Sequence, residues 1–163
     1  MKPDDTLTTI FRHNLWANQT LFELCAGLTD EQLDAAVPGT YGTISSTLEH
    51  IALAERGYFS RISTGQRYQR PEDDPPLTMD VLLASITKTG SDFLEWIGRV
   101  AAEDAVMIDW DGTPRPVPKT VILTQVINHA TEHRAQIMVT LTQLGIEPPE
   151  LDAWMYFDVS DKG

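Results

Sequence analysis

The sequence contains very little cysteine and few basic residues. Cys25 is the single cysteine among 163 residues, so no internal disulfide can form and a reducing cytoplasm is the expected compartment. Lysine and arginine together number 12 against 24 acidic residues, which gives a formal net charge of −12. Because a sequence-independent grip on phosphates needs clustered basic side chains, this balance argues against a nucleic-acid partner.

Long apolar runs are also missing. No stretch approaches the ~18 consecutive apolar residues of a membrane-spanning helix, so no membrane partner is expected. The chain begins with polar and acidic residues, which does not fit a signal peptide. With 42% apolar and 22% charged residues, the composition is that of an ordinary globular protein. The length suits one domain over residues 1–163 with a substantial core.

Apolar residues recur at helical spacing in four long segments, which are residues 4–28, 44–63, 79–102 and 120–144. Between the first two, residues 28–37 predict a short helical turn that Thr29 and Gln32 begin with a capping box. Four long amphipathic helices in a chain of this size predict an all-α fold, a four-helix bundle.

Three segments outside the long helices carry signals of their own. Residues 66–76 are polar and rich in proline and acid, which predicts a solvated crossover or a mobile flap. Residues 106–117 alternate around an Asp-Gly pair, a hairpin signal, but the prolines that follow it are expected to prevent a regular second strand. We therefore expect a short ribbon or extended loop there. The aromatic segment 151–157 is expected to pack back onto the bundle.

Two of the four histidines, His129 and His133, are four residues apart in the last long helix. Positions i and i+4 project from one face of a helix, here in line with apolar residues that face a core. A buried imidazole needs a partner for its nitrogens, and a divalent metal ion is one such partner. His50 lies at the inward edge of the second long helix. Three neutral imidazoles from two helices match the ligand number of a catalytic zinc or nickel site that leaves other positions to water.

The histidine spacing also allows other interpretations. His-x-x-x-His pairs are common in helices by chance, and neutral histidines can also satisfy one another, a nearby side chain or a carbonyl. His129 to His133 also spells His-x-x-Glu-His, the inverted zinc-protease signature. That class takes a third ligand from a distant acidic residue. Here the remaining acids lie in a short tail beyond the end of the helix, which disfavours the protease.

Polar residues near the pair are candidates to assist a metal site. Glu132 fits a catalytic base or a partner of a metal ligand, and equally a solvent-facing helix acid. Arg134 fits an anion-binding group for a substrate, or an ion-pair partner of Glu132 or of a surface acid. The further candidates to hydrogen-bond a metal ligand are Thr47, Asn128 and Gln136.

Three segments of this sequence match a known pattern in order and spacing: residues 16–18 (WAN), 46–55 (STLEHIALAE) and 128–137 (NHATEHRAQI). Through them the sequence resembles the DinB-like (damage-inducible) family of small helical metal proteins. The resemblance implies an up-down-down-up bundle. It also implies a divalent metal, zinc or nickel, on His50, His129 and His133. A homodimer is implied as well.

Two functions from different classes follow. Related bundles include thiol-dependent S-transferases and isomerases, so the resemblance implies a metal-dependent enzyme that activates a low-molecular-weight thiol, or water, as a nucleophile. Glu132 is the candidate catalytic residue of that enzyme. The alternative is a non-catalytic stress-response bundle in which a bound metal or small ligand stabilises the fold. The family name refers to induction by DNA damage and does not imply DNA binding.

Overall fold

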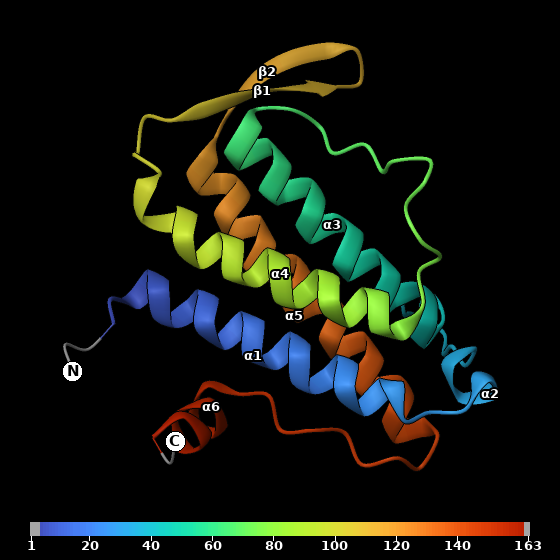
Figure 1. Cartoon of the computed structure of the whole chain (residues 1–163). Helices are drawn as coiled ribbons and strands as arrows, with labels where there is room; N and C mark the ends of the chain where they lie inside the picture. Colours follow the sequence, from blue (N-terminus) through green and yellow to red (C-terminus); the bar gives the residue numbers. More distant parts are fainter. Residues whose placement is uncertain (1–3, 162–163) are drawn as a thin grey trace.

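The computed structural model describes residues 4–161 and is mainly helical with one small two-stranded sheet (Figure 1). The elements in chain order are α1 (Thr6–Ala26), α2 (Asp30–Leu33), α3 (Ile44–Thr64), α4 (Met79–Trp96), η1 (Ile97–Arg99), β1 (Ala105–Trp110), β2 (Thr113–Pro118), α5 (Lys119–Gln143) and α6 (Ala153–Ser160). Over these residues, no helix combines the length and the apolar character needed to cross a membrane.

The ends of the helices follow local capping chemistry. Thr43 and Thr78 accept a backbone hydrogen bond at the start of α3 and α4, and α2 begins with the predicted capping box. The four long helices lie close to their predicted positions, with one difference. The third ends at Trp96 rather than near residue 102, and the tight turn η1 follows. Gly98 lies in that turn, where its low helix propensity favours the early end.

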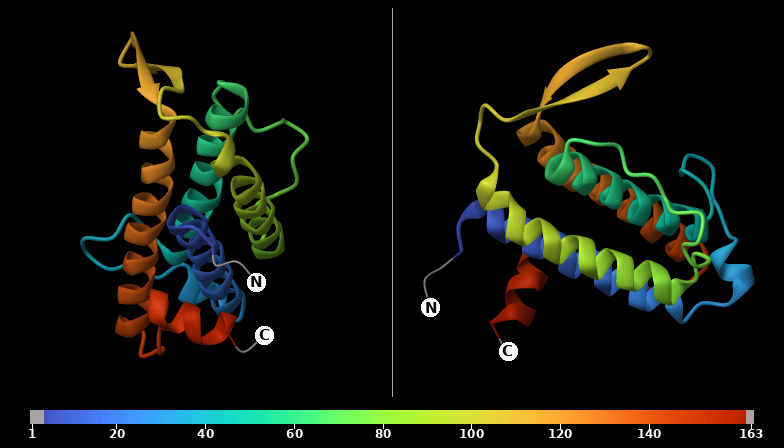
Figure 2. Two further views of the ribbon diagram at one scale, coloured as in Figure 1. Left: turned by 90° about the vertical axis from the view of Figure 1, so that its left-hand side faces the viewer. Right: turned by 45° about the horizontal axis from the view of Figure 1, so that its top comes forward.

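Each long helix packs against two others. α1 contacts α4 and α5, and α3 contacts the same two helices (Figure 2). The approach of α1 to α4 is close at Gly90, where a Cβ atom would lie 2.6 Å from Leu15 Cδ1. A side chain at position 90 would therefore require the Leu15 side chain to move.

The hairpin β1–β2 is a regular antiparallel pair along both strands. Asp111 and Gly112 have φ angles of 54° and 79°, as a two-residue hairpin turn requires. The expectation that the prolines prevent a regular second strand is therefore wrong. Pro114, Pro116 and Pro118 alternate along β2, so all three lack their N–H on the same edge. That is the outer edge, where no partner strand needs a donor.

Two apolar clusters fill the interior. One lies toward the α2 end of the long helices and the other toward the hairpin end. Between them, at the middle of the helices, lie four buried polar side chains that we call the polar belt: Asn14, Asn18, Glu55 and Arg134. The core is thus two apolar halves separated by a polar layer.

The C-terminal segment packs on α1, in agreement with the expectation for the aromatic tail (Figure 2). The ring of Tyr156 on α6 lies 5.6 Å from that of Trp16. His13 Nε2 lies 2.8 Å from the carbonyl oxygen of Leu151. The fourth histidine therefore helps to hold this tail.

Candidate metal centre

The three histidines singled out from the sequence converge. α3 contributes His50 and α5 contributes His129 and His133, and their ligand-capable nitrogens lie within 4.8 Å of one another. The Nε2 atoms of His50 and His129 are 2.9 Å apart. The pairwise distances between ring centroids run from 4.4 to 4.8 Å. Two helices that are far apart in the chain thus bring three imidazoles to one point.

Gln136 fixes the orientation of one ring. Its Oε1 atom lies 2.9 Å from His133 Nδ1. An amide oxygen only accepts, so Nδ1 carries the proton and donates it, which leaves Nε2 of His133 with a free lone pair. The same Oε1 atom accepts the backbone N–H of Tyr41 at 3.1 Å. Such a partner on the far ring nitrogen is what orients a metal-binding histidine.

Burial favours the neutral form of His50 and of His129. Desolvation, with the charges of His133 and His50, lowers the pKa of His129 to about 4. The pKa of His50 is lowered by burial and then by His133. Neutral imidazole is the form that binds metal.

A divalent ion fits these residues. Two nitrogen ligands on a tetrahedral zinc stand about 3.4 Å apart, so the Nε2 pair would need to open only slightly. His129 Nδ1 is buried without a hydrogen-bond partner among residues 4–161, and an ion held by Nε2 would not supply that partner, so the fit rests on the three converging imidazoles. Within the described chain the group contains no thiol or carboxylate. Three neutral imidazoles suit zinc, nickel, copper or iron and leave positions for other ligands.

Two tyrosines pack against the histidines. The sequence alone did not identify them as part of the site. The ring of Tyr41 stacks on His50 at a centroid distance of 4.2 Å, with an interplanar angle of 18°. Tyr58 meets His129 edge-on at 5.7 Å. Tyr58 lies eight residues after His50, about two turns along the same face of α3, so helical spacing could have found it. Tyr41 lies in the loop before α3, where no periodicity applies.

The other predicted helpers lie in different places. Glu132 is exposed and does not belong to the histidine group, so its catalytic role stays a prediction. Asn128 is exposed and lines a groove with α1 residues, and Thr47 Oγ1 donates to the carbonyl oxygen of Thr43. Among the predicted helpers in the described chain, Gln136 is the one that bonds a histidine.

Arg134 lies in the polar belt, so the hypothesis that it meets a substrate or a surface acid is wrong. It is 4% exposed, and its Nη1 donates to Asn14 Oδ1 at 2.8 Å and to Asn18 Oδ1 at 2.6 Å. The two asparagines donate in turn to Glu55 Oε1 at 3.0 and 2.7 Å. One residue beyond His133 is about 100° around the helix, which turns Arg134 toward α1.

The two charged members of the belt are shifted by burial. Desolvation raises the pKa of Glu55 to about 7, against the opposing hydrogen bonds from Asn14 and Asn18 and the charge of Arg134. Desolvation lowers the pKa of Arg134 to about 10, against the opposing charge of Glu55. Arg134 is therefore charged at neutral pH, while Glu55 is near the midpoint of its titration.

A cleft of about 380 Å³ opens beside the histidine group. His50 and Tyr58 line one part of it, and Tyr68, from the segment after α3, lines another. A small molecule in this cleft would touch a histidine of the group.

Comparisons with known proteins identify the family and the fold. The model of the DinB family matches residues 3–162 of the chain. The chain is 23% identical over 160 residues to protein DinB of Bacillus subtilis (strain 168), covering 90% of this chain and 91% of that protein. Its fold is similar to the crystal structure of a DinB-like protein from Bacillus cereus ATCC 10987, with a TM-score of 0.61 and 22% identity. That match covers 85% of this chain and 91% of the other. The chain therefore belongs to the DinB family.

Proposed function

We propose that the protein holds one divalent metal ion, zinc or nickel, on His50, His129 and His133, and is a metal-dependent enzyme of the thiol S-transferase type. The observation that carries this proposal is the convergence of three imidazoles beside an open cleft. When bound, such an ion supplies a Lewis acid that lowers the pKa of a thiol or a water toward neutrality.

The reaction is a nucleophilic transfer. A thiol R–SH and an electrophile R′–X give R–S–R′ and H–X. The carbon–sulfur bond forms as the bond to X breaks, and the thiol proton leaves with X. With water in place of the thiol the same balance describes a hydrolase, which is the nearest variant.

The chain's own residues prepare the site. Gln136 holds His133 in the tautomer that presents Nε2, and burial keeps His50 and His129 neutral at pH 7. The rings of Tyr41 and Tyr58 pack against His50 and His129. The site is thus oriented before a ligand arrives, which lowers the cost of binding.

Elemental analysis of untagged protein tests whether the histidine group binds a metal ion, and the same analysis is made on His129→Ala. We expect close to one equivalent in the wild type and a loss of stoichiometric metal in the variant. His13→Ala is the matched control, because it removes the histidine that holds the tail and leaves the group intact. Full metal content in His129→Ala would place the metal elsewhere.

Metal-loaded protein incubated with a panel of small thiols and electrophiles tests the activity. We expect turnover that chelation abolishes. If chelation lowers the thermal stability while no thiol binds and no product forms, the protein is instead a non-catalytic metal-binding bundle.

Glu132 is proposed as a base that takes the nucleophile's proton. Removing a general base costs about 10²–10⁴-fold in rate, so Glu132→Gln should lower turnover by that order while the metal content stays unchanged. Glu147→Gln, another exposed acid, is the control. Unchanged turnover in Glu132→Gln would assign this residue to the solvent-facing surface alone.

We also propose the up-down-down-up order, a homodimer and a cytoplasmic location. This order of helix directions is supported by the ribbon in Figure 1, where α3 and α4 are antiparallel to α1 and α5.

A dimer is supported by Trp154 and Phe157, which are 82% and 58% exposed on α6. Light scattering after size exclusion tests the dimer, and a monomeric mass contradicts it. The cytoplasm is supported by Cys25, a free buried thiol.

A further inference from the structure

The cleft beside His50 is basic in an acidic protein. Arg61, on the last turn of α3, and Arg67 and Arg70, on the segment after it, line the cleft. No carboxylate is among its lining residues, although acidic residues outnumber basic ones by 24 to 12 in the chain. The local charge is thus opposite to that of the whole molecule, and such a cleft attracts anions.

Two of these arginines have no acidic partner among residues 4–161. Arg70 Nε lies 3.5 Å from Asp74 Oδ2, which offsets its charge. Arg61 donates from Nη1 to the carbonyl oxygen of Gly57 at 3.2 Å. Neither Arg61 nor Arg67 forms an ion pair within residues 4–161. Their guanidinium groups are therefore free to bind a carboxylate or a phosphate.

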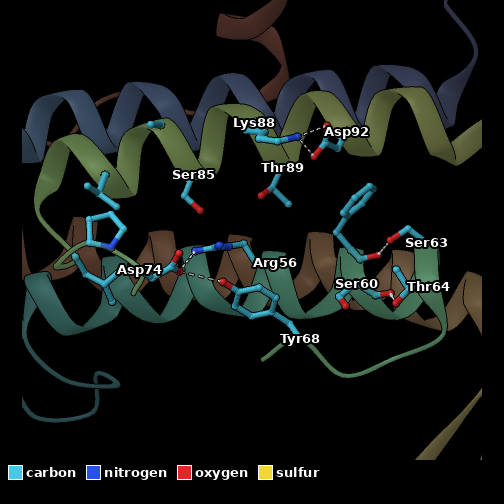
Figure 3. Close-up of a pocket in the computed structure, with 15 residues that line it drawn as sticks. Arg56, Ser60, Ser63, Thr64, Tyr68, Asp74, Ser85, Lys88, Thr89 and Asp92 are labelled. Carbon is cyan, nitrogen blue, oxygen red and sulfur yellow. Dashed lines mark hydrogen bonds and ion pairs between the residues drawn. The ribbon is translucent and has the colours of Figure 1, made fainter. Parts of the chain in front are cut away.

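The segment that carries Arg67 is anchored on α3. Tyr68 Oη donates to Asp74 Oδ2 at 3.3 Å, and Arg56 lies 3.5 Å from the same oxygen (Figure 3). The guanidinium of Arg56 also lies over the ring of Tyr68, 4.4 Å from its centroid. The segment predicted as a crossover or flap is thus tied to α3 next to Arg67, which gives this arginine a defined place.

The geometry of α3 sets the separation between His50 and Arg61. His50 and Arg61 are eleven residues apart on α3, which returns to within about 20° of the same face after a rise of about 16 Å. Because the Arg61 side chain turns back to Gly57, its guanidinium lies nearer, about 10 Å along the axis from the level of His50. A ligand with one end at the histidine group can therefore place its other end at Arg61.

We propose that this cleft binds the anionic end, a carboxylate or a phosphate, of a small thiol whose sulfur reaches the histidine group. Arg61 and Arg67 determine this specificity. The proposal rests on the proposed function, because it names the substrate class of the same site. It explains why an acidic protein gathers unpaired arginines beside its histidines.

Calorimetric titration of zinc-loaded protein with ω-mercaptooctanoate and ω-mercaptooctanol tests the proposal. The two thiols match in length and differ in the carboxylate. We expect the acid to bind about five- to tenfold more tightly, as one or two partly exposed charge-assisted hydrogen bonds allow. Titration with ω-mercaptooctyl phosphate then distinguishes the two anions, since the tighter of the two acids names the natural group.

Variants locate the effect. The preference for the acid should disappear in the double variant Arg61→Gln/Arg67→Gln and persist in Arg99→Gln/Arg115→Gln, which removes the same two charges at exposed arginines outside the cleft. Arg61→Lys keeps the charge and should keep part of the preference. Circular dichroism on each variant checks that the fold is retained.

The outcomes separate this inference from the proposed function. Equal affinity for the acid and the alcohol, or a preference that survives in the double variant, overturns the anion site and leaves thiol binding intact. The preference for the acid could need Arg61 and yet be the same without zinc. That result supports the anion site and shows that the thiol does not bind the metal. No binding of either ligand overturns both.

Discussion

α3 and α5 contribute side chains to two polar clusters that differ in almost every physical respect. On α3, His50 and Glu55 are five residues apart, and on α5, His133 and Arg134 are adjacent. The histidine group is partly exposed and borders a cleft, whereas the polar belt is sealed between two apolar clusters and contains a charge. A turn of about 100° around α5 separates one environment from the other.

The two clusters also differ in how completely the protein satisfies them. In the belt, two asparagines join the acid to the arginine, so each charged group has hydrogen-bond partners. In the histidine group, His129 Nδ1 is buried without a partner among the described residues. A complete network contributes to one defined packing of α1, α3 and α5, whereas in the histidine group the lone pair of His133 Nε2 stays free to receive a ligand.

The clusters respond to pH in opposite directions. The folded pKa of Glu55 is about 7 against an ordinary 4.5, so the stability it contributes is present below pH 4.5 and lost as the pH rises through 7. The folded pKa of His129 is about 4 against an ordinary 6.5. In the metal-free protein its contribution is present above pH 6.5 and lost as the pH falls through 4.

Arg134→Met should give the largest effect. It leaves Glu55 buried without its positive partner, and breaking a buried charge pair costs about 3–5 kcal/mol of the free energy of unfolding. Urea unfolding at pH 7 measures it. The double variant Glu55→Leu/Arg134→Met removes both charges and should recover much of the loss. A cost below about 1 kcal/mol for Arg134→Met would mean that the belt is not needed for the fold.

Glu55→Gln should remove one limb of the pH dependence. The wild type should lose on the order of 2–3 kcal/mol through Glu55 between pH 4.5 and 7, because the unfolded chain releases this proton first. The variant cannot. The difference in unfolding free energy between wild type and variant, measured in urea at several pH values, cancels the histidine contribution. A difference that does not change with pH contradicts the raised pKa of Glu55.

Gln136→Ala should weaken metal binding without weakening the fold. Losing the partner of a metal-binding histidine costs about 10- to 100-fold in affinity. Competition with a chelator of known affinity measures this, and Gln143→Ala, an exposed glutamine at the end of α5, is the control. If the affinities of the two variants are equal, Gln136 does not orient His133.

Tyr41→Ala should have the smallest effect. The Tyr41 side chain is 53% exposed, so its removal should change the free energy of unfolding by less than about 1 kcal/mol. Its ring covers His50, and we expect metal to exchange a few-fold faster in stopped-flow chelation. An unchanged exchange rate would show that the loop before α3 does not cover the site.

Much of the fold follows from the sequence because helical periodicity and capping are local. Thr43, Thr78 and the pair Thr29–Gln32 mark helix starts within a few residues of chain, and the structure has them in place. The prediction for the hairpin was partly wrong. Each proline weakens a strand by itself, and only the pairing of β2 with a single partner decides that all three face the free edge.

The sequence by itself determined the long helices, the face of α5 that carries His129 and His133, and the pairing of these two with His50 through a resemblance. Spacing along a helix is enough for residues of one face, because the helix repeats every 3.6 residues. The tertiary structure alone decided that Tyr41 covers His50, that Arg134 turns inward to Asn14 and Asn18, and that Arg61 and Arg67 meet in one cleft. Those contacts join segments that are distant in the chain, and their geometry is set by how the helices pack rather than by any local pattern.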